Sequence, residues 1–356
     1  MIASKNGHLD TVKMLLTCPA VVASAGVANE DGNTALMLAS QCGCPELVNV
    51  LLACPAILDS AGAVNTFGCT ALLIASINGH DKVVTALLSR ASIIASASVV
   101  DADGDTALML ASHYGHPESV RALLACPAIF ESAGAVNPFG CTSLMIASTH
   151  GHALALASQV GYTESVRVLL ECPVVVASAG VVDADGDTAL MLASAYGHTE
   201  SVRALLACPA INEFAGATNF SGNTALILAA YYGHTLVVNA LLACPVVVVS
   251  ACKINADGFT ALMLASEEGH AEVVTALLTC PAVVASAGVV DANGDTALML
   301  AVMQGHVETV KALLTCPAIV ASAGVVDNNG CSALMIAEQD GHERIIQLLR
   351  TKKCNL

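Results

Sequence analysis

Cysteine and histidine, the residue types best suited to bind metals or act as nucleophiles, recur at a regular spacing in this chain of 356 residues. A Cys-Pro pair recurs mostly every 36 residues, and Arg90 replaces it once. Copies one repeat apart would lie roughly 10 Å apart, beyond the reach of a disulfide. No N-terminal segment resembles a secretory leader, which favours reduced thiols. We therefore expect these cysteines to be small buried residues at helix ends: Cys18, Cys54, Cys126, Cys172, Cys208, Cys244, Cys280 and Cys316.

Three other patterns resemble chemical sites. Cys42-Gly43-Cys44 is one close pair without a second, so we expect no zinc site. The segments 101–105 and 183–187 both read Asp-Ala-Asp-Gly-Asp and begin like a calcium loop, but the bidentate glutamate at position 12 is absent. We interpret them as acidic hairpin tips. No phosphate loop or nucleophile–base set is present, so we expect no cofactor and no enzyme.

Composition limits the class of protein. Hydrophobic residues make up 55% of the chain and charged residues only 12%, with a net charge of −16 and a mean hydropathy of +0.70. That much apolar surface excludes disorder, and the negative charge disfavours nucleic acid and favours a basic partner. The longest uncharged stretch, 273–290, contains Pro281 and Gly288. We therefore expect no membrane span and a cytoplasmic location.

Glycine at one recurring position defines a tandem repeat. From Gly7 to Gly341 this glycine returns every 36 residues, except for one step of 10 between Gly151 and Gly161. Histidine usually follows it, which allows either a relay of imidazoles or a structural turn. The chain therefore divides into about ten units. We place them at 1–28, 29–64, 65–100, 101–136, 137–182, 183–218, 219–254, 255–290, 291–326 and 327–356.

The unit 101–136 predicts two helices preceded by a hairpin. Asp103-Gly104 is a hairpin turn signal, and Thr106 is a suitable N-cap for an apolar helix that Gly115 ends. Pro117 suits the start of a second helix, which should end before Cys126-Pro127. A short turn should follow before the next hairpin.

This order, with Thr-Ala-Leu-Met at 106–109 and the Gly-His pair, resembles the ankyrin repeat over essentially the whole chain. The usual motif is Thr-Pro-Leu-His and the usual period is 33, so the extra residues fall after the second helix. The resemblance implies an all-α repeat solenoid of helix–turn–helix–hairpin units stacked in one curved array. It also implies that each Gly-His pair closes a turn with a backbone hydrogen bond.

Three places depart from the regular repeat. The 10-residue step predicts an elongated or bulged segment between Thr149 and Val160, where a fused pair of repeats has lost residues. The first unit begins inside its first helix, without a polar cap, so the chain is a fragment or a partner covers that face. The last unit should present a polar outer face: Glu338, Asp340, Glu343, Arg344, Gln347, Arg350, Lys352 and Lys353.

The resemblance implies binding on the concave face made by hairpin tips and first helices. Eight of the eleven aromatic residues occupy its variable positions: Phe67, Tyr114, Phe139, Tyr196, Phe220, Tyr231, Tyr232 and Phe259. Either they form a partner-binding surface, or the core positions simply exclude bulky residues. The acidic tips that should attract a basic partner are Asp103, Asp105, Asp185, Asp187 and Asp295.

We therefore predict a non-catalytic scaffold that binds a partner protein or peptide. Two alternatives remain at this point. One is a structural protein that associates with itself end to end through the uncapped N-terminal face. The other is the repeat region of a larger enzyme or channel.

Overall fold

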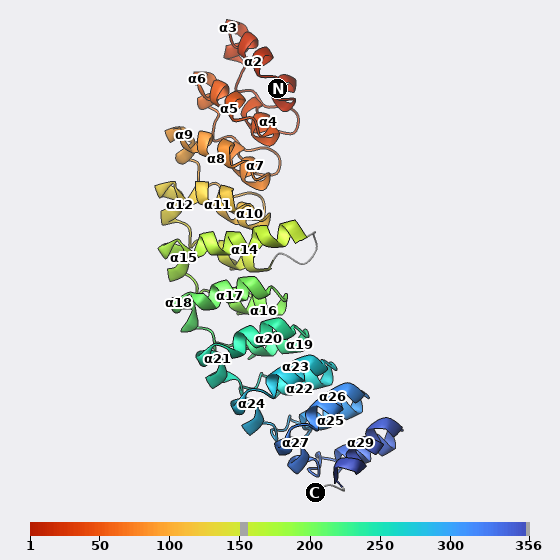
Figure 1. Ribbon diagram of the computed structural model, residues 1–356. Helices are drawn as coiled ribbons and strands as arrows, with labels where there is room; N and C mark the ends of the chain where they lie inside the picture. Colours follow the sequence, from red (N-terminus) through yellow and green to blue (C-terminus); the bar gives the residue numbers. More distant parts are fainter. Residues whose placement is uncertain (150–155, 354–356) are drawn as a thin grey trace. The chain divides into compact units, whose positions relative to one another are not determined.

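Groups of helices, joined by hairpin loops and mostly three to a group, recur along the chain in the computed structural model (Figure 1). The structure describes residues 1–149 and 156–353, and side-chain environments for 1–149 and 162–352. It divides into two compact units, Met1–Val181 and Val182–Leu356. Among the described residues the hairpins contribute only isolated β-bridges, Val136 with Thr142 and Val326 with Ser332.

The first unit contains five sets of helices, which Figure 1 shows stacked in chain order. The first helices are α1 (Ile2–Lys5), α4 (Ala35–Cys42), α7 (Ala71–Ile77), α10 (Ala107–His113) and α13 (Ser143–Thr149). The second helices are α2 (Leu9–Leu15), α5 (Pro45–Leu52), α8 (Asp81–Leu88), α11 (Pro117–Leu124) and α14 (Leu156–Leu170). The short third helices are α3 (Pro19–Ala23), α6 (Pro55–Leu58), α9 (Ala91–Ile94), α12 (Pro127–Glu131) and α15 (Pro173–Ala177).

The second unit repeats the same order. Its first helices are α16 (Ala189–Ala195), α19 (Ala225–Tyr231), α22 (Ala261–Glu267), α25 (Ala297–Met303) and α28 (Ala333–Gln339). Its second helices are α17 (Thr199–Ala207), α20 (Thr235–Leu242), α23 (Ala271–Leu277), α26 (Val307–Leu313) and α29 (Glu343–Lys353). Its third helices are α18 (Pro209–Asn212), α21 (Pro245–Ser250), α24 (Pro281–Ala285) and α27 (Pro317–Ser322).

The start and end of α10 confirm the predicted capping signals. Oγ1 of Thr106 accepts a hydrogen bond from the backbone N–H of Met109, at 3.3 Å. The Met109 sulfur in turn accepts the Thr106 N–H, at 3.5 Å. Gly115, at φ +69°, makes the left-handed turn after α10. The methionine in Thr-Ala-Leu-Met therefore takes part in capping its own helix.

A third helix, rather than a simple turn, follows each Cys-Pro pair of the described chain. Cys126 ends the second helix in an extended conformation and acts as N-cap of α12, with Pro127 at the first helical position. Cys126 is only 6% exposed, and Ile129 of α12 is also buried. The buried role predicted for the Cys-Pro cysteines is confirmed at most of these positions, although Cys18 is exposed and Cys208 is half-buried.

Packing between neighbouring repeats buries the apolar positions in both units. The first helix α10 lies between α7 and α13, and the second helix α11 lies between α8 and α14. Leu108 and Leu123, one from each helix of this repeat, are almost fully buried. Burial of small aliphatic side chains against both neighbours stabilises each repeat, because no single repeat can cover its own apolar face. The predicted all-α repeat solenoid is thereby confirmed for each unit.

The irregular repeat differs from the others in its second helix. Helix α14 runs without interruption through Gly161, whereas the equivalent glycines of other repeats, such as Gly115, end a helix in the left-handed conformation. Residues 150–155 of the predicted elongated or bulged segment lie outside the described residues. From Leu156 onward the extra sequence lengthens the second helix to 15 residues.

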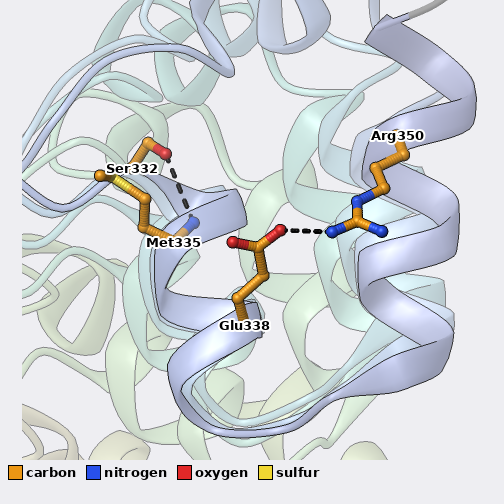
Figure 2. Close-up of polar contacts among 4 residues, drawn as sticks. All are labelled: Ser332, Met335, Glu338 and Arg350. Atoms are coloured by element: carbon orange, nitrogen blue, oxygen red, sulfur yellow. Dashed lines mark hydrogen bonds and ion pairs between the residues drawn. The ribbon is translucent and has the colours of Figure 1, made fainter.

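The last repeat has the predicted polar outer face on its described side chains. Figure 2 shows Glu338 at the end of α28 paired with Arg350 of α29, at 2.7 Å. It also shows the N-cap of α28, in which Oγ of Ser332 accepts from the Met335 N–H at 3.4 Å. The other side of α29 is apolar and buried through Ile345, Ile346 and Leu349.

Candidate functional site

Histidine rings join neighbouring repeats. Nε2 of His116 donates to the backbone oxygen of Ile77 in the preceding repeat, at 3.0 Å. A Cβ atom added to Gly79 would lie 2.5 Å from the His116 ring, so only glycine leaves room for it. Burial of the ring lowers the pKa of His116. The same bond to the preceding repeat is made by His80, His234, His270 and His306.

These bonds confirm a structural role for the histidines and differ from the expectation in one respect. The accepting carbonyl lies one repeat earlier in the chain, rather than inside the turn that the Gly-His pair forms. The five histidines that make these bonds therefore stabilise the stacking of neighbouring repeats.

A second row of hydrogen bonds links the hairpins. Oδ1 of Asn137 accepts from the backbone N–H groups of Phe139 and Cys141, at 3.1 and 2.9 Å, which holds the hairpin turn. Nδ2 of the same Asn137 donates to Oδ1 of Asp105 in the preceding hairpin, at 2.9 Å. We call these inter-repeat bonds the hairpin row. Its other described members are Asn65 with Asn33, Asn219 with Asp187, and Asn255 with Asn223.

Whether a hairpin begins with asparagine or aspartate varies with the side chain that faces it from the preceding hairpin. Cys69 and Phe259 offer no carboxylate or amide oxygen, and the hairpins that follow them begin with Asp101 and Asp291 instead of asparagine. Each of these aspartates still accepts the two N–H groups of its own turn. Asparagine therefore begins a hairpin where the preceding hairpin offers a side-chain oxygen that can accept its amide N–H.

Asp295 is the exception to this pairing. The next hairpin begins with Asp327, which has no amide to donate, and Oδ1 of Asp295 has no hydrogen-bond partner among the described residues. Asp295 is only 7% exposed. Burial raises its pKa, and the charges of Asp291 and Asp327 raise it further. The expectation that Asp295 is an exposed tip open to a partner is therefore wrong.

The predicted hairpin phenylalanines are largely exposed. Phe67 and Phe139, in the first unit, are 67% and 60% exposed, and Phe220 in the second unit is 74% exposed. Phe220 covers Gly186 of the preceding hairpin, where an added Cβ would lie 2.8 Å from the ring. Phe259 is half-buried. Side chains of this size so exposed contribute little to the core, which agrees with a surface role.

The predicted tyrosines lie at the other end of the first helices. Tyr114, Tyr196 and Tyr232 stack on the histidine two residues later, with ring centroids 6.2 to 6.4 Å apart. Tyr231 packs edge-on against Tyr232, at 4.9 Å. All four side chains remain exposed. The Tyr–His contacts hold the rings in place, which lowers the entropy that a partner would have to remove.

The predicted aspartates fall into two groups. Asp103 and Asp185 are exposed, whereas Asp105 and Asp187 are half-buried and accept the amides of the hairpin row. Burial raises the pKa of Asp105 and of Asp187, and the donated amide opposes that rise. The structure thus gives the second pair a role between repeats.

An exposed apolar group outside the predicted set lies in the second unit. Phe214 follows α18 and is 44% exposed, Leu236 lies in the first turn of α20, and Val249 of α21 is 82% exposed. These residues belong to the side of the repeats that carries the second and third helices. Only the bulk of Phe214 at a position otherwise filled by small residues distinguishes it in the sequence.

In the described part of the chain, no three or more histidine, cysteine or acidic side chains are placed to hold a metal ion. No described helix is both long and apolar enough to cross a membrane.

The repeat geometry agrees with a family comparison. The model for ankyrin repeats, which describes three copies at a time, matches residues 1–97, 91–156, 154–250, 212–284 and 280–356. These matches cover the chain from end to end, and the chain belongs to the ankyrin repeat family. Ankyrin repeats are generally protein-interaction modules and are typically non-catalytic. A comparison with curated protein sequences finds no match.

Proposed function

We propose that this chain is a non-catalytic scaffold that binds a basic partner protein or peptide through the aromatic residues of its second unit. The proposed surface comprises the hairpin tips and first helices of Val182–Leu356, and we call it the aromatic face. Its members are Tyr196, Phe220, Tyr231, Tyr232 and Phe259. Phe67, Tyr114 and Phe139, with Asp103, occupy the equivalent positions of the first unit and would contact a partner there in the same way.

The exposure of aromatic rings carries this proposal. Phe220 and Tyr232 leave 74% and 52% of their surface in contact with water, near the two ends of one first helix, α19. Large aromatic side chains dominate the binding energy of protein interfaces, because they bury much area and lose little entropy. Exposed rings at these positions are therefore best explained by contact with a partner.

The charge around the aromatic face supports a basic partner. Burial raises the pKa of Glu267, at the end of α22, and the carboxylates of Glu268 and Asp291 raise it further. Asp185 is exposed on a hairpin tip of the same unit. A lysine or arginine from a partner would relieve this crowding of negative charge, and the chain's net charge of −16 would speed the encounter.

Replacing Tyr231, the last residue of α19, together with Tyr232, its C-cap, tests the aromatic face. The double variant Tyr231→Ala, Tyr232→Ala should lose at least about tenfold in affinity, because a contributing aromatic is worth about 2 kcal/mol. The full chain is used to capture partners, and the partner recovered is identified and its affinity for each variant measured by calorimetry. Circular dichroism checks that the repeats remain folded.

Phe214→Ala is the matched control, since Phe214 is an exposed aromatic outside the aromatic face. It should leave affinity unchanged. Equal affinity of the double variant and the unmodified chain would reject the aromatic face, and so would an equal loss with Phe214→Ala. If the partner is basic, its affinity for the chain should also fall as the salt concentration rises.

Self-association is the second candidate. The first repeat exposes Ile2 and Met14, at 80% and 74%, so apolar contact between copies has a surface available there. Light scattering across a concentration series distinguishes the two functions. A mass that stays at 35.9 kDa at every concentration would remove self-association.

A further inference from the structure

One turn of the first unit carries two cysteines at the positions where three other repeats carry tyrosine and histidine. Cys42 ends α4, Gly43 follows in the left-handed conformation at φ +74°, and Cys44 begins the approach to α5. Their sulfur atoms lie 3.1 Å apart. No other two cysteines of the chain are separated by a single residue.

The same turn brings side chains into contact in other repeats. Around Gly115, Tyr114 stacks on His116, and the residues flanking Gly197 and Gly233 stack in the same way. The two residues that flank this left-handed glycine therefore bring their side chains together in each of these repeats. The contact between Cys42 and Cys44 follows from the repeat's backbone.

The position of Cys44 also explains why a thiol is tolerated there. Histidine at this position normally covers the glycine of the preceding repeat, as His80 covers Gly43. Here both sulfurs cover Gly7, where an added Cβ would lie 2.9 Å from the sulfur of Cys42 and 3.1 Å from that of Cys44. The two thiols fill the space of one imidazole ring, and both remain half-exposed.

We propose that Cys42 and Cys44 form a reversible dithiol–disulfide site whose oxidant is a low-molecular-weight disulfide such as glutathione disulfide. Closing the bond requires the sulfurs to approach by about 1 Å, to roughly 2.05 Å. Half-exposure lets a small disulfide reach the site from solvent. The site lies between the first and second repeats, so its oxidation state affects that contact.

The two thiols have different parts in the reaction. Burial, together with the hydrogen bond and the charge of Cys44, raises the pKa of Cys42 to about 11. Because Cys42 therefore holds its proton, the sulfur of Cys44 is the attacking atom.

The exchange balances in two steps. The Cys44 thiolate attacks one sulfur of glutathione disulfide, forming a mixed disulfide and expelling one glutathione thiolate. Cys42 then gives its proton to solvent, and its sulfur attacks the sulfur of Cys44, forming the Cys42–Cys44 bond and expelling the second glutathione. The two cysteines lose two electrons and two protons, and one glutathione disulfide becomes two glutathione thiols.

Mass spectrometry of the full chain tests this site. The reduced chain is incubated with excess glutathione disulfide, quenched in acid, treated with N-ethylmaleimide and cut after glutamate. Cleavage after Glu30 and Glu46 releases 31–46, which contains no cysteines other than Cys42 and Cys44. We expect this peptide to be lighter by two hydrogens, without glutathione or maleimide, and to accept two maleimides after treatment with dithiothreitol.

The same digest contains its own control. The peptide 1–30 carries one cysteine, the exposed Cys18, and should end as a glutathione mixed disulfide. Cys42→Ser should stop at a mixed disulfide on Cys44. A 31–46 peptide that carries two maleimides or two glutathiones, after Cys18 has reacted fully, overturns the proposal.

Denaturation shows how much the folded turn, rather than closeness in the sequence, favours the disulfide between Cys42 and Cys44. In urea the ratio of intramolecular disulfide to mixed disulfide should fall by about tenfold or more, because the turn no longer orients the two thiols. An unchanged ratio in urea would overturn the assignment of this site to the folded turn.

Discussion

Single side chains decide how well one repeat contacts the next. The amide of Asn137 reaches the carboxylate of Asp105, and the imidazole of His116 reaches the carbonyl of Ile77. Asn137 is buried and Asp105 and His116 are half-buried, and a polar atom shielded from water without a partner costs more free energy than one that is paired. Asp295 is the described hairpin side chain whose oxygen lacks this partner, because the side chain of Asp327 has no N–H to donate.

Asp327→Asn should repair this contact. The new amide can donate to Asp295 as Asn137 donates to Asp105, while its oxygen still accepts the two N–H groups of its own turn. We expect the free energy of unfolding at pH 7 to rise by about 1 kcal/mol, measured by urea denaturation of the full chain. The reverse change, Asn137→Asp, should lower it by a similar amount, and a stabilising Asn137→Asp would contradict this account.

The stability that Asp327→Asn adds should depend on pH. The folded pKa of Asp295 lies above its ordinary value of 3.8, so its protonated form favours folding. This favourable contribution is present in full below the ordinary value and is lost as the pH rises through the raised pKa. The advantage of Asp327→Asn should therefore shrink as the pH falls through that range, and a constant advantage would implicate another cause.

Helices begin and end where local residues dictate, with one exception. Threonine at the N-cap and left-handed glycine at the end define first helices such as α10. Helix α14 instead continues through Gly161, although the sequence around that glycine resembles an ordinary helix end. The chain between α13 and α14 is too short to form a complete extra repeat, so the leftover segment joins the second helix.

Two glycine replacements test this difference. Gly161→Ala should raise the free energy of unfolding by about 0.5 to 1 kcal/mol, because alanine favours a helix interior. Gly115→Ala should lower it by about 1 to 2 kcal/mol, because an alanine at φ +69° is strained. Its Cβ would also lie 3.1 Å from the Tyr162 ring. Urea denaturation measures the free energy of unfolding of both variants. An equal loss of stability in the two variants would mean that Gly161 also ends a helix.

At the scale of the whole molecule, stability is a sum over neighbouring repeats. Each helix packs on the equivalent helix of the adjacent repeat, as α19 does on α16 and α22. Such arrays fold in segments, because a repeat needs only its neighbours. The division between Val181 and Val182 falls in the loop between α15 and α16.

Residues 182–356 should therefore fold alone. We expect a helical circular dichroism spectrum and one cooperative urea transition, because this segment begins at a hairpin and ends at the polar helix α29. A matched segment, 200–356, lacks α16 and begins inside α17, and should unfold at lower urea. Absence of a cooperative transition in 182–356 would contradict the division into two units.

The sequence alone determined the repeat, its period and the class of fold. Glycine, threonine and proline act on the backbone locally, so their spacing predicted first and second helices such as α10 and α11 from Thr106, Gly115 and Pro117. The small aliphatic residues at the repeated positions predicted stacking, because only neighbouring repeats could bury them.

The tertiary structure decided the contacts between repeats. The carbonyl that accepts the histidine proton lies 39 residues away, and the oxygen that accepts the asparagine amide lies 32 residues away. No local rule links residues at those distances. Only stacking buries Asp295 and places the sulfurs of Cys42 and Cys44 over Gly7, since each depends on the space that a neighbouring repeat leaves.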